Sequence, residues 1–301
     1  MFEIPTEVPG ALRSACKCVP IDPDWPISGP LHAMELMRDW DIKEDKRTDW
    51  GQSQYERAIT HSHAGEFEDL QRLGPTRVYK ESIYTKFVSI GWHLAGRYEY
   101  DVDFIRLLTE MNWLSPRGEQ LTMIDFGAAP WIQSIFYANK GLDVIAVNAD
   151  LESDCNRFGR FLAERNGYER IPGKPEYKIT DTWFKGSNGL AHDNERWITE
   201  ESSFEEGWKD YSYDIVYAID VLEHIPPQAD GSPGWVPVAD KLYEQLSPGG
   251  IWYVNAPLTY DTTVHPVPTH PVHFTSPISH EAWATAKGLI PTSYSCVWRK
   301  L

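Results

Sequence analysis

The amino-acid sequence predicts an α/β fold: a doubly wound, mostly parallel sheet with helices on both faces, preceded by a mainly helical extension. Two observations predict it. From residue 121 onward, short apolar segments of strand length alternate with longer amphipathic segments. Before residue 118, apolar and aromatic residues recur at helical spacing instead. We therefore divide the chain into an N-terminal arm and helical extension over residues 1–118 and an α/β domain over residues 119–301.

The extension begins with a proline-rich arm. Prolines are frequent in the first 30 residues, and proline lacks the N–H group that a helix needs. Helical patterns follow over residues 31–40, 50–73, 79–94 and 104–111. A Ser-Pro-Arg-Gly segment at residues 115–118 is expected to end the last of these helices.

The α/β domain alternates between two kinds of segment. Strands are predicted over residues 121–126, 143–148, 177–180, 214–219, 250–255 and 292–298. Helices are predicted over residues 131–140, 152–166, 236–246 and 277–287. The polar stretch over residues 185–210 is predicted to be an inserted loop. Because strands alternate with helices, we expect the strands to be mainly parallel.

Ligand-binding residues are expected just after these strands. In open parallel sheets, ligands bind beyond the carboxyl ends of the strands, near the point where the strand order reverses. A glycine after the first strand would permit a tight turn and a close approach of a ligand to the backbone. The candidate cofactor-binding residues after the first four strands are Asp125, Gly127, Ala129, Trp131, Asn148, Asp150, Asp181 and Asp220.

A nucleoside is the ligand chemistry that these positions suit. A carboxylate at the end of the second strand can accept hydrogen bonds from both hydroxyls of a ribose. Asp181 is placed to accept a hydrogen bond from an adenine amino group. The helix that begins near Trp131 presents the N–H groups of its first turn.

Three later segments carry a family resemblance. Residues 213–216 (YDIV) run into residues 220–225 (DVLEHI), and residues 246–250 (LSPGG) precede the next strand. In this order and spacing they resemble the class I S-adenosylmethionine-dependent methyltransferases of small-molecule type, over about residues 119–301. The resemblance implies a Rossmann-like fold, S-adenosylmethionine as cofactor with S-adenosylhomocysteine as product, and a small-molecule acceptor. It also implies that the N-terminal helices cover the acceptor site.

The first loop departs from the family pattern. Of the three glycines in the family's loop only Gly127 remains, and Ala129 and Trp131 stand at the other two positions. The indole of Trp131 is expected to crowd the methionine end of the cofactor or to redirect it. Asn148 stands where the family has its ribose acid, and Asp150 is the substitute two residues on. A degenerate, non-catalytic protein of this fold, serving as a binding or scaffold protein, is therefore the alternative.

An RNA methyltransferase is the less favoured third hypothesis. Residues 127–130 (GAAP) are similar to the loop of RNA ribose methyltransferases, which depend on lysines after later strands. Asp220 follows the fourth strand here, with no lysine beside it. A formal net charge of −16 would also repel a polyanion, so nucleic acid is not the expected partner.

Histidines are the candidate catalytic bases. The expected reaction is direct displacement at the methyl group, with O-methylation of a hydroxyl favoured, and a base assists by taking the hydroxyl proton. Histidine suits this task near neutral pH, and the candidates are His224, His270 and His273. The alternative for His224 is a helix-start residue bonded to backbone. A divalent metal at His265, His270, His273 and Asp261 is the minor alternative, because hard cations prefer oxygen ligands, so no metal is assigned.

Composition limits the compartment. No apolar run approaches the ~20 residues that span a bilayer, and the first ten residues lack the segments of a secretory signal. The 4 cysteines are scattered, which fits a reducing compartment. We therefore expect a cytoplasmic protein without a membrane span, and the sequence leaves its oligomeric state open.

Overall fold

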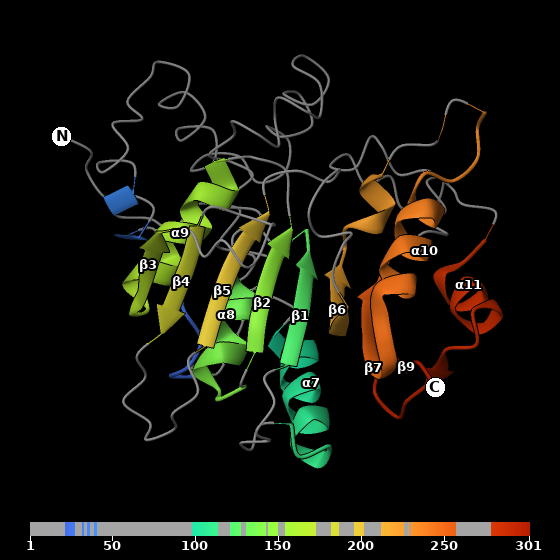
Figure 1. Cartoon of the computed structure of the whole chain (residues 1–301), viewed down its shortest axis with the longest axis horizontal. Coiled ribbons are helices and arrows are strands. Elements are labelled where there is room, and N and C mark those ends of the chain that lie inside the picture. Colours follow the sequence, from blue (N-terminus) through green and yellow to red (C-terminus); the bar gives the residue numbers. More distant parts are fainter. Residues whose placement is uncertain are drawn as a thin grey trace.

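A computed structural model of the chain gives one nine-stranded sheet with helices on both faces (Figure 1). The structure describes residues 22–27, 32, 35–36, 39–40, 98–113, 121–127, 131–142, 144–149, 154–172, 182–186, 196–201, 212–225, 228, 230–256 and 278–301.

The strands follow the order β3-β4-β5-β2-β1-β6-β7-β9-β8 across the sheet. In chain order they are β1 (Leu121–Phe126), β2 (Val144–Ala149), β3 (Tyr168–Pro172), β4 (Thr182–Gly186), β5 (Arg196–Glu201), β6 (Tyr213–Ile219), β7 (Leu246–Asn255), β8 (Ile290–Pro291) and β9 (Val297–Arg299).

The five central strands are parallel. β5, β2, β1, β6 and β7 pair in parallel, whereas the strands outside them pair antiparallel. The chain leaves β1 toward β2 and β5 on one side, and β6 and β7 lie on the other side of β1. The order therefore reverses between β1 and β6, and this switch point is where ligands of such sheets bind. The predicted Rossmann-like, doubly wound architecture is confirmed by this order.

Helices cover the two faces of the sheet. In chain order they are α7 (Tyr98–Glu110), α8 (Ile132–Asn139), α9 (Asp154–Arg165), the short 3₁₀ helix η3 (Leu222–His224), α10 (Trp235–Gln245) and α11 (His280–Ala286). Apolar side chains of α7, α8 and α9 share one buried cluster with one face of the sheet. Those of α10 and α11 share a second cluster with the opposite face. The sheet is therefore the middle of three layers.

The described residues between 22 and 40 pack onto the layer of α8 and α9. The rings of Trp25 and Phe136 meet edge-on with 4.6 Å between centroids. The Nζ of Lys140 lies 2.9 Å from carboxylate oxygens of both Asp22 and Asp24. These contacts fasten the arm to the C-terminal end of α8.

Two of the motif segments act structurally. The Asp214 carboxylate accepts a hydrogen bond from the backbone N–H of Thr122 at 2.9 Å, which ties the start of β1 to β6. Gly250 lies where a Cβ would be 2.7 Å from Leu246 Cδ1 and 3.0 Å from the carbonyl oxygen of Asp214. The register of β6 against β7 shifts at this place. The glycine thus allows β7 to enter the sheet beside β6.

The prediction of an inserted loop over residues 185–210 is wrong in part. β5 lies inside this range and pairs in parallel with β2, taking the place of the third parallel strand. Trp197, Ile198 and Thr199 are good strand formers, but charged residues on both sides masked their signal. β3 was not predicted, and with β4 it extends the sheet beyond β5. The predicted strand over residues 177–180 lies outside the described residues.

The last strand is shorter than predicted. β9 begins only at Val297, and residues 292–296 form a turn in which the Thr292 N–H donates to the Val297 carbonyl at 2.9 Å. The Thr292 hydroxyl accepts the N–H of Tyr294 at 3.1 Å, which stabilises the turn. A polar side chain that bonds its own backbone in this way competes with strand formation.

Within the described segments, no helix has the length and apolar character needed to cross a membrane. The cytoplasmic location stays a prediction.

His280 is a buried histidine in the second cluster. It begins α11, and its Nε2 accepts a hydrogen bond from the indole N–H of Trp252 at 2.9 Å. Its ring stacks on Trp252 and Trp283. Burial lowers the pKa of His280 from 6.5 to about 4, with a smaller opposing effect from the charge of Glu281. The neutral imidazole is therefore part of the folded core.

We expect His280→Gln to reduce the acid sensitivity of the fold. The pKa of His280 is lower in the folded protein than in the unfolded chain. The contribution of the neutral imidazole to folding stability is therefore complete above pH 6.5 and is lost as the pH falls toward 4. The full loss would be roughly 3 kcal/mol. Glutamine keeps an acceptor for Trp252 but does not titrate. Urea unfolding at about pH 7 and about pH 4.5 should show a smaller loss in the variant, and an equal loss in both proteins would contradict the role of His280.

Candidate functional site

The chain leaving β1 meets the chain leaving β6 at the switch point. Gly127 follows β1 with φ +77°, and its N–H donates to the Ala149 carbonyl at the end of β2 at 2.7 Å. A Cβ at Gly127 would lie 2.2 Å from Cγ2 of Val221. Both the backbone conformation and the lack of space therefore require glycine.

Asp220 occupies the turn after β6. It is a non-glycine residue with φ +52°, in the left-handed region that is uncommon for such residues. Its N–H donates to the carbonyl of Asn255 at the end of β7 at 2.9 Å. Asp220 and Gly127 thus bring the carboxyl ends of β2, β1, β6 and β7 together. η3 follows directly, with His224 as its last residue.

A row of polar residues crosses the sheet just below this edge. Asp125 of β1 pairs in register with Asn148 of β2 and with Tyr217 of β6, and Tyr217 pairs with Tyr253 of β7. Asp125 is 2% exposed and Asn148 is fully buried. Polar side chains in such a position need hydrogen-bonding partners, because an unsatisfied buried group costs free energy.

Among the described residues, Asn148 has no such partner. Neither its Oδ1 nor its Nδ2 makes a hydrogen bond, although the side chain is fully buried. A buried amide in this state costs about 1–3 kcal/mol relative to a satisfied one. Unsatisfied buried groups of native proteins call for an explanation, and a missing ligand is one of them. The position at the end of β2, beside Asp125, makes Asn148 a candidate for binding a group that both donates and accepts.

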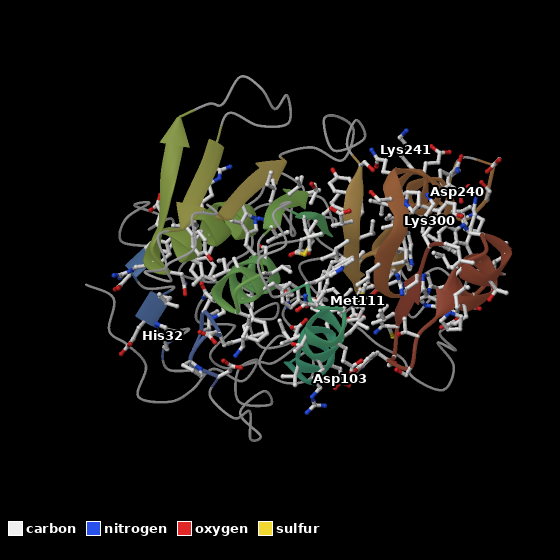
Figure 2. All side chains as sticks on the ribbon, turned by 60° about the horizontal axis from the view of Figure 1, so that its bottom comes forward. His32, Asp103, Met111, Asp240, Lys241 and Lys300 are labelled. Carbon is white, nitrogen blue, oxygen red and sulfur yellow. The ribbon has the colours of Figure 1, made fainter. Side chains whose placement is uncertain are left out.

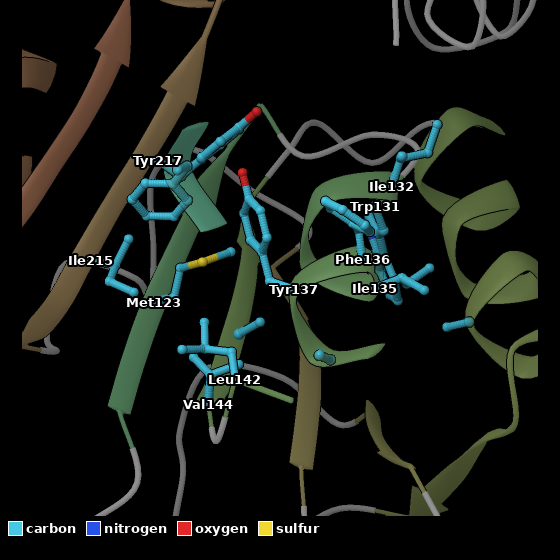
Figure 3. Packing of buried hydrophobic residues seen from close by; sticks show 14 of the residues in the cluster. Met123, Trp131, Ile132, Ile135, Phe136, Tyr137, Leu142, Val144, Ile215 and Tyr217 are labelled. Atoms are coloured by element: carbon cyan, nitrogen blue, oxygen red, sulfur yellow. The ribbon is translucent and has the colours of Figure 1, made fainter. Parts of the chain in front are cut away.

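A second buried carboxylate lies on the same face. Asp101 of α7 is fully buried and accepts hydrogen bonds from the hydroxyls of Tyr137 at 2.6 Å and Tyr217 at 3.1 Å. The side-chain amide of Gln133 donates to it at 3.4 Å. Burial, and then the Asp101 charge, hold the pKa of Tyr137 well above its ordinary value, so this phenol stays a donor. The network joins α7 and α8 to β6, and Tyr217 pairs in register with Asp125 of β1. Figure 3 shows the rings of Tyr137 and Tyr217.

Trp131 is the residue before α8. It has φ +68°, and its side chain makes no capping hydrogen bond to the helix. Its indole is fully buried, and it lies on the side of α8 that faces α9, whereas Tyr137 lies on the side that faces β1 (Figure 3). The indole therefore packs between two helices.

The structure does not describe the side chains of the other predicted site residues. Ala129, Asp150, Asp181, His270 and His273 lie outside the described residues, as do His265 and Asp261 of the metal alternative. His224 is placed in η3, but its side chain lies outside what the structure describes. In the described parts of the chain, no three His, Cys, Asp or Glu residues come together as metal ligands could. The structure thus brings together Asp125, Gly127, Asn148 and Asp220.

Sequence reasoning missed Asp101 and Tyr217. Asp101 lies on the helical stripe of Phe104 and Leu108, three and seven residues on, and a carboxylate on an apolar stripe signals a buried network. Tyr217 lies two residues after Ile215 on the same face of β6. The alternation of side chains along β6 could have predicted the face on which Tyr217 lies. Its place beside Asp125 follows only from the register of β6 against β1.

In comparisons with known proteins, similar proteins were found among the solved structures. No protein-family model and no curated protein matches the chain. The chain is similar to a protein assigned as a sarcosine dimethylglycine methyltransferase from Galdieria sulphuraria, at 17% identity and a TM-score of 0.41 over 64% of this chain and 62% of that one. An O-methyltransferase family protein from Burkholderia thailandensis is 12% identical, with a TM-score of 0.40, over 91% of this chain and 73% of its own.

A third similar structure was solved with S-adenosyl-L-methionine. It is a phosphoethanolamine N-methyltransferase 2 from Haemonchus contortus, 15% identical with a TM-score of 0.36, over 75% of this chain and 44% of its own. Identities of 12–17% do not assign an activity, so the activity of this chain is inferred from its own residues.

Asn148→Leu is expected to stabilise the protein without ligand. Leucine has a similar size and removes two unsatisfied polar atoms, so the free energy of unfolding should rise by about 1–3 kcal/mol. Asn139→Leu is the matched control, because the Asn139 amide donates to the Asp24 carbonyl and accepts from the Tyr168 hydroxyl. Urea unfolding should show the control destabilised. If Asn148→Leu is destabilised as well, the amide of Asn148 has partners within the protein.

Asp101→Asn is expected to destabilise the fold. The amide oxygen can still accept from both phenols, as Oδ1 does, but the amide nitrogen replaces Oδ2, which accepts from Gln133, and adds a buried donor with no acceptor, which should cost about 2–4 kcal/mol. Asp103→Asn on the same helix is the control, since Asp103 is exposed and pairs with Arg106 at the surface (Figure 2). The control should change stability by less than about 1 kcal/mol. Equal losses of stability in the two variants would show that the buried network contributes no more to stability than the surface ion pair does.

Proposed function

We propose that this protein transfers the methyl group of S-adenosylmethionine to a small-molecule acceptor, most readily to a hydroxyl. The observation that carries the proposal is Asn148, a fully buried amide with two unsatisfied atoms at the end of β2. The ribose diol of a nucleoside supplies both a donor and an acceptor for it. The switch point next to β1 supports the same conclusion, because nucleotide cofactors bind there in open α/β sheets.

The residues at this edge fit the parts of the cofactor. Asn148 would hold the ribose, Gly127 allows close approach to the backbone after β1, and Asp125 supplies a buried carboxylate beside both. Asp220 stands at the turn after β6, on the opposite side of the switch point. We propose that Asp150, Asp181 and Ala129 complete the site. S-adenosylmethionine supplies an electrophilic methyl group on a sulfonium when it is bound.

The electrostatics of the site favour a positively charged cofactor. Two buried carboxylates, Asp101 and Asp125, lie on the face of the sheet that the polar row occupies, and the whole chain carries a formal charge of −16. A negative potential favours a sulfonium and disfavours a polyanionic acceptor such as RNA. This supports a small-molecule acceptor over nucleic acid.

The chain's part in the chemistry is alignment and proton removal. Direct displacement needs the nucleophile, the methyl carbon and the sulfur in line, which is a matter of positioning. For a hydroxyl acceptor, a histidine near neutral pH can take the proton as the new bond forms. We propose His224, His270 or His273 for this role, of which His224 follows the site directly in η3.

Calorimetric titration of S-adenosylhomocysteine tests the proposal. We expect wild type to bind, and Asp125→Asn and Asn148→Leu to bind at least about tenfold more weakly, which is about 1.4 kcal/mol per variant. Asp103→Asn and Asn139→Leu are the matched controls and should bind as wild type does. Asn148→Leu would then combine higher stability with lower affinity. Absence of heat with both S-adenosylmethionine and its product would contradict the proposal and favour a non-catalytic scaffold protein.

A further inference from the structure

Trp131 adopts a backbone conformation that normally belongs to glycine. Its φ of +68° and ψ of +19° lie in the left-handed region, which a side chain with a Cβ rarely enters. Its carbonyl accepts hydrogen bonds from the N–H of Ile135 and the hydroxyl of Ser134, both at 3.2 Å. The backbone of Trp131 is therefore fixed as the first turn of α8, at the edge where the candidate site lies.

The indole of Trp131 packs against Gly159 of α9. A Cβ at Gly159 would lie 2.6 Å from Cγ and 2.8 Å from Cδ1 and Cδ2 of the indole. Real Cβ atoms essentially never approach so closely, so the ring rests on the bare Cα of Gly159. Glycine within a helix is otherwise less favourable than alanine. The buried indole explains why this helix position carries glycine.

We propose that Gly159 is a positioning residue for the cofactor site, through Trp131. The indole packs against Gly159 between α8 and α9, so its ring does not lie over the site. The loop after β1 can therefore have tryptophan where the family's loop has glycine. Any side chain at residue 159 would displace the indole and, with it, the first turn of α8. The ligand part of this inference rests on the proposed function, whereas the packing part does not.

A double-mutant cycle on thermal stability tests the packing of Trp131 against Gly159. In wild type, Gly159→Ala should lower the melting temperature, because the new Cβ collides with the indole. In the Trp131→Ala background the same change should raise it, because the ring is gone and alanine is the better helix former. Thermal unfolding of the four proteins without ligand measures this reversal of sign. The same direction of change in both backgrounds would overturn the pairing of Gly159 with Trp131.

Titration of S-adenosylhomocysteine onto the same four proteins tests the positioning. We expect Gly159→Ala to bind at least tenfold more weakly than wild type, and the double variant to bind within about threefold of Trp131→Ala. Ala163→Ser, in the next turn of α9, serves as the control for an added atom in this helix and should bind as wild type does. Unchanged affinity in Gly159→Ala would overturn the positioning role. If wild type itself does not bind, the proposed function fails, and the stability cycle still decides the packing.

Discussion

The close approach at Gly127 is the constraint on which the site depends. Three strand ends converge there, because the Gly127 N–H bonds to the end of β2 while Val221, after β6, occupies the space of a Cβ. Any larger residue would separate the chain leaving β1 from the chain leaving β6. The polar row of Asn148, Asp125 and Tyr217 exists at one level only because these strands stay in this register.

The buried polar side chains of Asp101 and Asn148 differ in their hydrogen-bonding partners. Asp101 is bound by two phenols and an amide from α8 and β6, so its place in the core is explained by the protein alone. Asn148, beside Asp125, is not explained by the protein, because both of its amide atoms lack partners. We interpret the first arrangement as scaffold and the second as part of a ligand site. The scaffold comes in part from α7, so this helix before β1 helps to build the face that carries the candidate site.

The sequence predicted the central sheet well because its signals are local. Short apolar runs define β1, β2, β6 and β7, and Gly127 marks the end of β1. β5 was missed because the residues around it are charged, and its pairing with β2 joins segments about 50 residues apart in the sequence. Of the candidate site residues, Asp125, Gly127, Asn148 and Asp220 lie at or just after the strand ends where the sequence placed them, and their role in binding stays a prediction. The partner of Trp131 could not be predicted, since Gly159 is 28 residues away and only the packing of α8 on α9 brings the two together.

A crystal structure of the protein with S-adenosylhomocysteine would test the central claim most directly. We expect the ribose hydroxyls to bond to Oδ1 and Nδ2 of Asn148, with the indole of Trp131 still resting on Gly159. A nucleoside bound elsewhere, or an Asn148 amide bonded to the protein itself while the ligand is present, would contradict it.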